Sequence, residues 1–348
     1  MAIDIIGTGR NLPFKKVTND DLSFQIDTND EWIRSHTGIG SRYLAGEDTA
    51  CSDLAIEAAK NALAMANGYT GEETADRDKA AAEAVSSIDV IIVATVSGDY
   101  VSLPSTACIV QDKLGVRNAA AMDILAGCTG FVYGLDTAAG LLSINKKRKR
   151  ALVIGSEVLS KIVSWNDRSL CVLFGDGAGA AVLEKTENQN SGILQSILYA
   201  DGSGFESLII KRGGTRSPFK TGEVIDTSDN NKFIAVDMNG QEVYNFAVKA
   251  LTDIIKELLE SAKINIDDVT RIVPHQANIR IVQAAAKRLH IPMEKFYLNI
   301  EKYANTSSAS IPIALDEMNR NGHLKKGDLI LIVGFGGGLT YGGSVIIW

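Results

Sequence analysis

The stretch that decides the fold class is Ile88-Asp-Val-Ile-Ile-Val93, a short apolar run bounded by polar and small residues. Runs of this kind are typical of β-strands that are buried on both faces. The segments Ala151-Leu-Val-Ile154 and Leu329-Ile-Leu-Ile-Val333 have the same character. Such strands alternate with helical stretches along the chain, so the sequence predicts an α/β fold.

The two halves of the chain repeat one plan around these strands. In the first half we expect strands at 90–93, 122–124 and 151–154, with helices near 104–114 and 130–142. In the second half we expect strands at 271–273, 296–299 and 329–333, with a helix near 279–289 and another after Asn305. We interpret the repeat as an internal duplication. It divides the chain into an N-terminal half, residues 1–185, and a C-terminal half, residues 186–348.

Two segments stand apart from this plan. Residues 67–87 are rich in Thr, Glu, Asp, Lys and Ala, and we interpret them as an exposed insertion with one helix over 76–85. Residues 213–232 are polar and contain glycine, which favours a long surface loop. Loops of this kind often frame active sites.

The composition is that of a globular enzyme: 45% of the 348 residues are hydrophobic and 22% are charged. The net charge of -7 argues against general nucleic-acid binding, which needs a basic surface. No run reaches the roughly 18 apolar residues of a membrane span, and the first residues lack the features of a signal peptide. The four cysteines and four histidines are scattered, so we expect no metal site and a reducing, cytoplasmic setting.

The first candidate for chemistry is Cys128, in Asp123-Ile-Leu-Ala-Gly-Cys-Thr-Gly-Phe131. A strand ends there, small residues follow, and a helix begins. A helix N-terminus favours an anion, and this is one way to lower the pKa of a thiol and to form a thiolate nucleophile. The flanking glycines free backbone N–H groups for an oxyanion. The competing interpretation is a buried structural cysteine.

Three further motifs carry polar groups at the ends of expected strands. Val273-Pro-His275-Gln-Ala-Asn278 places His275 at the C-terminal end of a strand, where α/β folds bind ligands. Asn305 precedes small polar residues and an apolar helix, and a turn or cap role is its ordinary explanation. Gly334-Phe-Gly-Gly-Gly338 would expose bare backbone N–H groups. The glycines of residues 174–180 do not form a dinucleotide loop, because Ala180–Glu184 continues as a strand.

Together these motifs resemble the β-ketoacyl-acyl carrier protein synthase III family over nearly the whole chain. The resemblance is carried by stretches that include Asp30-Glu-Trp-Ile33, Gly127-Cys-Thr-Gly-Phe131, Phe174-Gly-Asp-Gly-Ala-Gly-Ala180, His275-Gln-Ala-Asn278, Asn305-Thr-Ser307 and Gly334-Phe-Gly-Gly-Gly338. It implies a thiolase-like five-layered αβαβα fold built from two similar halves. It also implies a homodimer that needs no cofactor, with CoA thioesters as substrates.

The resemblance implies the roles of the central residues. Cys128 would take an acyl group, with acetyl as the expected primer, from acyl-CoA. His275 and Asn305 would then handle malonyl-acyl carrier protein as it loses CO2, and this condensation would initiate fatty acid synthesis. The oxyanion hole would be formed by the backbone N–H groups of Cys128 and Gly337.

The same resemblance gives the outer contacts. CoA would bind at Trp32, His36, Arg168, Gln241 and Asn278, although the family often has Arg at the position of His36 and Asn at that of Gln241. Leu103 would reach into the acyl pocket of the partner subunit. Arg280, Lys287 and Arg288, on one face of a helix, would dock the acidic carrier protein; a solvated face is their ordinary explanation.

Two alternatives stay open at this stage. One is a specialised condensing enzyme or acyltransferase of the same fold, such as a polyketide starter synthase or a hydroxymethylglutaryl-CoA synthase. The last class uses a glutamate base near the cysteine, and Glu72 and Glu73, which lie in the insertion, are no obvious candidates. The other alternative is a non-catalytic thiolase-fold subunit, which would be expected to lose Cys128, His275 or Asn305.

Overall fold

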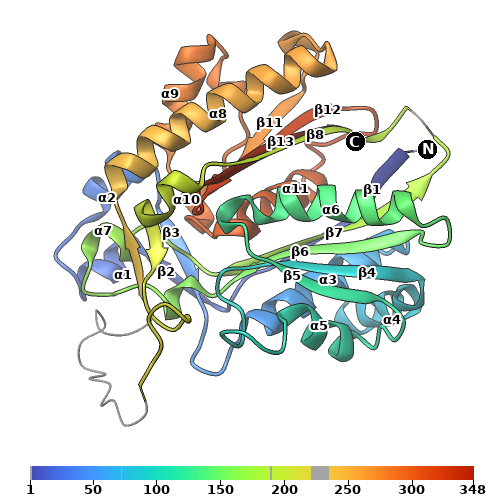
Figure 1. The fold of residues 1–348 in the computed structure, drawn as a ribbon, viewed down its shortest axis with the longest axis horizontal. Coiled ribbons are helices and arrows are strands. Elements are labelled where there is room, and N and C mark those ends of the chain that lie inside the picture. The colour runs from blue at the N-terminus through green and yellow to red at the C-terminus, as the bar shows by residue number, and fades with distance from the viewer. Residues whose placement is uncertain (1, 72, 189, 221–234) are drawn as a thin grey trace.

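Two β-sheets form the frame of the molecule, seen in a computed structural model that describes residues 2–71, 73–188, 190–220 and 235–348 (Figure 1). The first sheet has the order β1-β7-β6-β4-β5. Its strands are β1 (Ala2–Asn11), β7 (Gly177–Thr186), β6 (Arg150–Glu157), β4 (Ile88–Ala94) and β5 (Ala120–Ile124). The second has the order β11-β12-β13-β8, with β11 (Arg271–Pro274), β12 (Leu329–Gly336), β13 (Thr340–Ile347) and β8 (Gly192–Ala200).

Helices cover both sheets and also fill the space between them. The outer face of the first sheet packs against α3 (Cys51–Ala66), α4 (Thr74–Ala84) and α5 (Thr106–Leu114). Between the sheets lie α6 (Gly130–Ile144) and α11 (Ser310–Arg320). The outer face of the second sheet packs against α8 (Gly240–Ala262) and α9 (Ile279–Leu289). These five alternating layers, visible in Figure 1, confirm the predicted αβαβα architecture.

The apolar run of β4 shows why both faces of the first sheet are covered. Ile91 and Val93 pack toward α3, whereas Val90 and Ile92 pack toward α6 and α11. All four side chains are fully buried. Successive strand side chains point to opposite faces, so a continuous apolar run needs a layer on each side.

Smaller elements lie around the frame. Two small antiparallel sheets pair β2 (Lys15–Thr18) with β3 (Ser41–Leu44) and β9 (Leu208–Ile210) with β10 (Val236–Met238). The short helices are α1 (Asn19–Ser23), α2 (Asp30–Thr37), α7 (Arg168–Cys171) and α10 (Ile300–Tyr303). The 3-10 turns are η1 (Val85–Ser87), η2 (Gly127–Thr129), η3 (Leu159–Lys161), η4 (Gly202–Ser207), η6 (Ile266–Asp268), η7 (Met293–Lys295) and η8 (Ser307–Ala309).

Several expected elements need correction or comment. The strand predicted at 296–299 is not formed; a single parallel bridge joins Phe296 to Ile272, and the segment is confined between the turn at Met293–Lys295 and the helix that begins at Ile300. The helix of the 67–87 segment is present as α4, and Ala81 and Ala84 join the core against α3. Most of the loop predicted at 213–232 lies outside the described residues, which resume at 235. The strand continuation at 180–184 is confirmed within β7.

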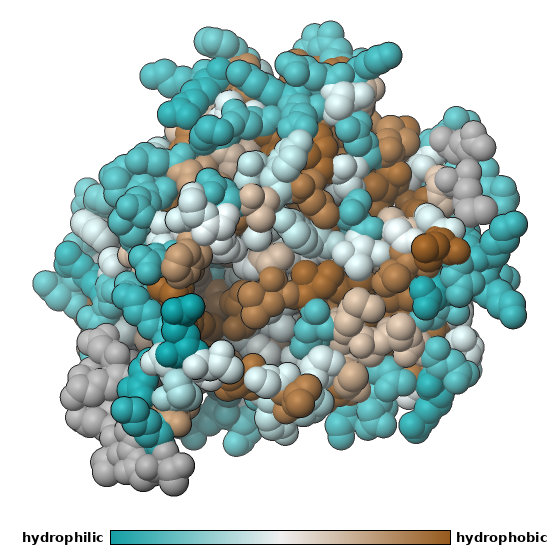
Figure 2. Space-filling model, viewed as in Figure 1, coloured by the Kyte–Doolittle hydropathy of each residue, from teal (hydrophilic) through white to brown (hydrophobic). Residues whose placement is uncertain are grey.

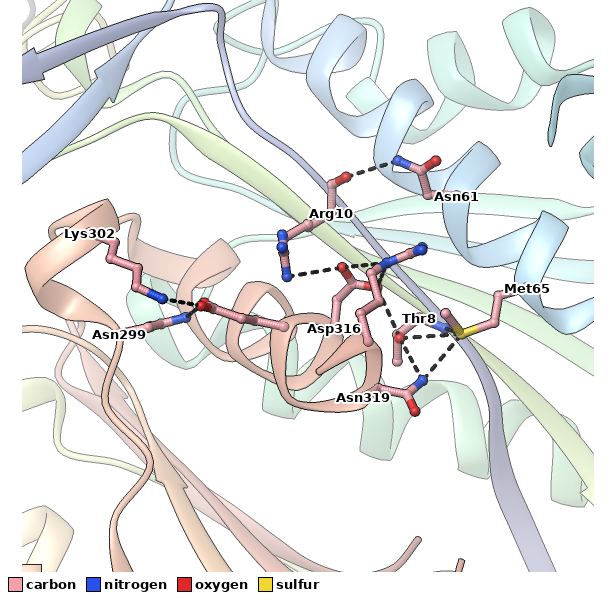
Figure 3. A network of polar contacts seen from close by, with 10 residues as sticks. Thr8, Arg10, Asn61, Met65, Asn299, Lys302, Asp316 and Asn319 are labelled. Carbon is pink, nitrogen blue, oxygen red and sulfur yellow. Dashed lines mark hydrogen bonds and ion pairs between the residues drawn. The ribbon is translucent and has the colours of Figure 1, made fainter. Parts of the chain in front are cut away.

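The central helix α11 is anchored by buried charges (Figure 3). Asp316, fully buried, accepts hydrogen bonds from Arg320 and lies 3.4 Å from Arg10 of β1. The adjacent Glu317 accepts from the side chain of Asn299 at 2.9 Å. Buried charges are stable only when paired and hydrogen-bonded. These contacts therefore fix α11 between the sheets, and α11 follows directly on the η8 turn described below.

Candidate active site

Cys128 lies in a tight turn between β5 and α6. The turn η2 spans Gly127–Thr129, and α6 begins at Gly130. Gly127 has a φ of +53°, and a β-carbon there would come within 2.8 Å of the Gly337 nitrogen. A β-carbon on Gly336 would approach the Cys128 nitrogen to 2.5 Å. The glycine loop (residues 336–338) thus lies directly against the cysteine turn (Gly127–Thr129). This close approach requires glycine at the contacting positions, because a side chain would clash.

The environment of the Cys128 thiol differs from the expectation. Burial raises its pKa to about 12. A hydrogen bond with the Ser307 side chain acts to lower the pKa. The low thiol pKa expected from the helix N-terminus is therefore wrong, because the desolvation of an anion in an apolar cavity outweighs the favourable contacts.

His275 follows the end of β11 and is almost fully buried. Its backbone N–H donates to Val333 O at 2.8 Å, and its ring meets Phe335 edge-on at 5.2 Å. Burial lowers the pKa of the imidazole from its ordinary 6.5 to about 3, so the ring is neutral at physiological pH.

The tautomer of His275 follows from its partner Ser310. The two atoms His275 Nδ1 and Ser310 Oγ lie 2.7 Å apart. The backbone N–H of Gln276 donates to the same hydroxyl oxygen at 3.4 Å, and that oxygen still has its own proton to donate to Nδ1. Nδ1 then accepts, and Nε2 carries the ring proton. His275 is thus set up as a neutral donor at Nε2.

Asn305 is held between two segments of backbone. Its N–H donates to Leu173 O and its carbonyl accepts from Gly175 N, both at 3.0 Å. Its side-chain oxygen accepts the N–H of Ser307 at 2.8 Å. That contact orients the amide, because the backbone N–H needs an acceptor, and it leaves the NH2 group of Asn305 as a donor. Ser307 itself has a φ of +49°, a strained conformation for a residue other than glycine.

The three side chains meet at one cavity of about 370 Å³. Cys128, His275 and Asn305 line it together with Gly336. Its walls are largely apolar, with Val172, Leu173, Phe174, Leu208, Met238, Val243, Phe246, Ala247, Ile281 and Phe335. A largely apolar cavity with a thiol, a neutral imidazole donor and an amide donor suits acyl transfer through a covalent thioester.

Trp32, His36 and Asn278 line the same cavity. The rings of Trp32 and His36 are stacked at 4.5 Å, and the guanidinium carbon of Arg168 lies 5.0 Å from the Trp32 ring centre. The side chain of Asn278 donates to His36 O at 3.0 Å and its oxygen caps α9.

The remaining predicted residues lie outside the cavity lining. Gln241, beside Gly240 of the lining, donates to Asn245 on α8. Leu103 is 85% exposed. Arg280, Lys287 and Arg288 are exposed on α9, and Arg280 Nε donates to Ser35 O at 3.1 Å. The structure therefore brings the three α9 residues to one helix but not into the cavity.

Sequence reasoning missed three residues around the central set: Glu157, Ser307 and Ser310. Glu157 is the last residue of β6 and fully buried, close enough to Cys128 to affect its pKa. Its position at the carboxyl end of a strand, beside the end of β4, is the signal that could have found it. The two serines follow Asn305 and gave no signal beyond a turn.

Within the part of the chain that the structure describes, no group of three His, Cys, Asp or Glu side chains could hold a metal ion. Likewise, none of the described helices has the length and apolar character needed to cross a membrane.

Comparisons with known proteins agree with this architecture. The family described as 3-oxoacyl-[acyl-carrier-protein] synthase III matches residues 122–202, and its C-terminal counterpart matches residues 259–348. A β-ketoacyl-[acyl-carrier-protein] synthase III of Caldanaerobacter subterraneus subsp. tengcongensis is 48% identical over 100% of this chain and 98% of its own. One of Clostridium acetobutylicum is 45% identical over 100% and 99%. The crystal structure of 3-oxoacyl-[acyl-carrier-protein] synthase III from Aquifex aeolicus matches with a TM-score of 0.85 and 42% identity, covering 99% of this chain and 100% of the other.

Five alternating layers around a shared Cys, His and Asn cavity define a thiolase-fold condensing enzyme. The full-length identity then narrows the class. The chain belongs to the 3-oxoacyl-[acyl-carrier-protein] synthase III family, whose members are acyltransferases.

Proposed function

We propose that the chain catalyses a decarboxylative Claisen condensation that initiates fatty acid synthesis. It would join the acyl group of a short acyl-CoA primer, with acetyl as the expected case, to malonyl-acyl carrier protein. The products are a β-ketoacyl-acyl carrier protein, CoA and CO2. The single observation that carries the proposal is the meeting of Cys128, His275 and Asn305 in one apolar cavity, with His275 held neutral.

The first half-reaction transfers the primer to Cys128. The sulfur of Cys128 forms a bond to the thioester carbon, the bond from that carbon to the CoA sulfur breaks, and the thiol proton ends on CoA. The raised thiol pKa means that the sulfur is protonated before the attack, so its proton has to pass to the departing CoA sulfur during the transfer. The Cys128 and Gly337 backbone N–H groups, brought together by the glycine contacts, would hold the tetrahedral oxyanion.

The second half-reaction uses the neutral donors. His275 Nε2–H and the Asn305 amide would donate to the thioester carbonyl of the malonyl group. The bond to the carboxylate carbon breaks, CO2 leaves, and the electron pair forms an enolate that these donors stabilise. The enolate carbon then attacks the acyl carbon on Cys128, the bond from that carbon to the Cys128 sulfur breaks, and the departing thiolate takes a proton from solvent to regenerate the thiol. A neutral histidine suits this step, because a carbonyl needs a donor and decarboxylation needs no base.

CoA is proposed to bind at the cavity mouth. The Trp32 ring and the Arg168 guanidinium already lie against each other, so an adenine base would enter by displacing Arg168, which is half exposed. His36 and Asn278 line the cavity that holds Cys128, and Gln241 is proposed to contact CoA next to Gly240 of the lining. The acidic carrier protein is proposed to dock on Arg280, Lys287 and Arg288 of α9, a local basic surface on a chain of net charge -7.

A homodimer in the cytoplasm completes the proposal. β5 is an edge strand of the first sheet, with no partner on its far side among the described strands. Figure 2 shows an apolar band across the face on which α6 lies, and the exposed large apolar side chains include Leu103, Leu125 and Ile144. An apolar surface beside an open sheet edge is typical of a subunit interface, and Leu103 would there enter the partner's acyl pocket.

All four cysteines are free thiols, as expected in a reducing compartment.

The specialised starter enzyme is not favoured. Relatives at 45 to 48% identity over the full chain carry the name β-ketoacyl-[acyl-carrier-protein] synthase III. A non-catalytic subunit is not favoured either, since all three central side chains are present and share one cavity.

Intact-mass spectrometry separates the two half-reactions. With acetyl-CoA alone, the wild type and His275→Ala should both gain an acetyl adduct, and Cys128→Ala should gain none. With malonyl-acyl carrier protein added, only the wild type should discharge the adduct into a β-ketoacyl product. A His275→Ala protein that forms no adduct, or that condenses at the wild-type rate, would contradict the assigned roles.

A further inference from the structure

Glu157 is a buried carboxyl that the proposed mechanism does not use. It ends β6 and has no exposed surface. One oxygen, Oε2, accepts from the hydroxyl of Thr95 at 3.2 Å, from Val96 N at 3.1 Å and from the hydroxyl of Ser97 at 2.6 Å. The other, Oε1, lies 2.7 Å from Ser308 Oγ. Glu157 therefore joins the end of β4 to the η8 turn, which begins two residues after Asn305.

The two contacts of Ser308 Oγ bear on the charge state of Glu157. Ser308 Oγ lies 2.8 Å from Ala94 O, which is only an acceptor, and 2.7 Å from Glu157 Oε1. A hydroxyl has one proton, so it cannot serve both contacts. Both are satisfied when Ser308 donates to Ala94 O and Glu157 donates from Oε1 to Ser308. The carboxyl is then neutral. Burial raises the pKa of Glu157, which agrees with this count.

The turn that Glu157 holds is the one that orients Asn305. Ser307, next to Ser308, donates its N–H to the Asn305 side-chain oxygen and has a strained φ of +49°. The turn also packs directly on β6: a β-carbon on Gly155 would come within 2.3 Å of Ser308 O. A strained turn persists only when its surroundings hold it in place. The hydrogen bond from Glu157 is the side-chain contact that ties Ser308 to the carboxyl end of β6.

We propose that Glu157, as a neutral acid, is a positioning residue that locks the Ser307–Ser308 turn and thereby aims the Asn305 amide at the malonyl carbonyl. The inference rests on the proposed function and assigns a residue to its second half-reaction. Ionisation would remove the proton that Glu157 donates to Ser308. It would also place a negative charge near Cys128 of η2 and Cys51 of α3, the titratable groups that face the carboxyl.

The test compares Glu157→Gln with Glu157→Ala. A glutamine amide can donate to Ser308 and accept from Val96 and Ser97 in the same arrangement as the neutral acid. We expect Glu157→Gln to keep the kcat of condensation within about threefold of wild type, and Glu157→Ala to lower it about tenfold or more, the effect of one lost hydrogen bond in a low-dielectric site. Acetyl transfer from acetyl-CoA to Cys128 should change less than condensation in both variants. Ser308→Ala, which removes the same contact from the other side, should reproduce the loss.

The dependence of the condensation rate on pH distinguishes this role from a purely structural one, which would not change it. Condensation by the wild type should decline on the alkaline side as Glu157 ionises, and Glu157→Gln should lack that decline. Two results would overturn the neutral positioning role. One is an equal loss of the condensation rate in Glu157→Gln and Glu157→Ala, with both variants shown to be folded by circular dichroism. The other is a Ser308→Ala variant that condenses at the wild-type rate. A wild-type protein that forms no condensation product would instead refute the proposed function itself.

Discussion

Replacing Ser310 with alanine is the sharpest test of how His275 works. The hydroxyl of Ser310 lies 2.7 Å from His275 Nδ1, and both residues are nearly fully buried. Without it, Nδ1 loses the donor that forces the ring proton onto Nε2. The ring can then adopt the other tautomer, in which Nε2 is an acceptor facing a carbonyl oxygen.

The size of the effect follows from the burial of the contact. A neutral hydrogen bond contributes about 1 kcal/mol, and leaving a buried acceptor unsatisfied costs about 1–3 kcal/mol. Each 1.4 kcal/mol or so is a factor of ten in rate. We therefore expect Ser310→Ala to slow condensation about 5- to 100-fold. Acetyl transfer to Cys128, which does not use the Nε2 donor, should stay within about threefold.

The assay is the pair of half-reactions: the rate of adduct formation from acetyl-CoA and the rate of product formation from malonyl-acyl carrier protein. Ser344→Ala is the matched control, because Ser344 is equally buried but its hydroxyl contacts that of Ser196, between β13 and β8 and away from His275. In a His275→Ala background, Ser310→Ala should have no further effect on condensation. Equal slowing of both half-reactions, or an additive loss in the double variant, would refute the reasoning.

Three other predictions concern stability and docking. Burial lowers the pKa of His275 from 6.5 to about 3, so between these pH values the unfolded chain binds a proton that the folded chain does not, and the protein loses stability as the pH falls from 6.5 toward 3. In urea unfolding, the free energy of unfolding of the wild type should therefore fall by about 1.4 kcal/mol per pH unit more than that of His275→Asn in this window. The same dependence on pH in both proteins would contradict the prediction. Gly155→Ala forces a β-carbon to within 2.3 Å of Ser308 O and should lower both the Tm and the rate of condensation. The control Gly140→Ala has no atom within 4 Å of the new β-carbon on the exposed side of α6 and should stabilise the protein by about 0.5–1 kcal/mol. Equal shifts of the Tm in the two variants, measured by calorimetry, would disprove the packing argument. Arg280→Glu should raise the KM for malonyl-acyl carrier protein more than the KM for acetyl-CoA. The control Lys113→Glu, exposed on α5 in the opposite outer layer, should change neither KM. An equal rise of both KM values in Arg280→Glu would rule out the docking role.

The layers could be predicted because each apolar run needs cover on both faces. The β4 run encodes two layers by itself, since alternate side chains pack against α3 and against α6 and α11. The segment at 296–299 shows the limit of that logic. Its apolar residues pack as a strand would, but only Phe296 pairs with β11, and backbone pairing depends on neighbours that the local sequence does not contain.

The site was predictable in its residues but not in its electrostatics. Cys128, His275 and Asn305 stand at chain positions that the motifs mark, and the fold brings them to one cavity. The thiol pKa was predicted in the wrong direction, because a helix N-terminus is a local feature whereas desolvation is produced by the whole cavity. Glu157 and Ser310 escaped notice for a related reason. Their roles arise from contacts with Ser308 and His275, which are 151 and 35 positions away in the chain.

The depth of Cys128 has a consequence for the lifetime of the acylated enzyme. The side chain is only 9% exposed and lies in a cavity with largely apolar walls. A thioester formed there is shielded from hydrolysis, because the apolar walls limit the access of water to its carbonyl and His275, whose pKa is lowered to about 3, is too weak a base to activate water. The loaded state should therefore outlast the interval before a carrier protein arrives. Its slow loss in buffer can be followed over time by mass.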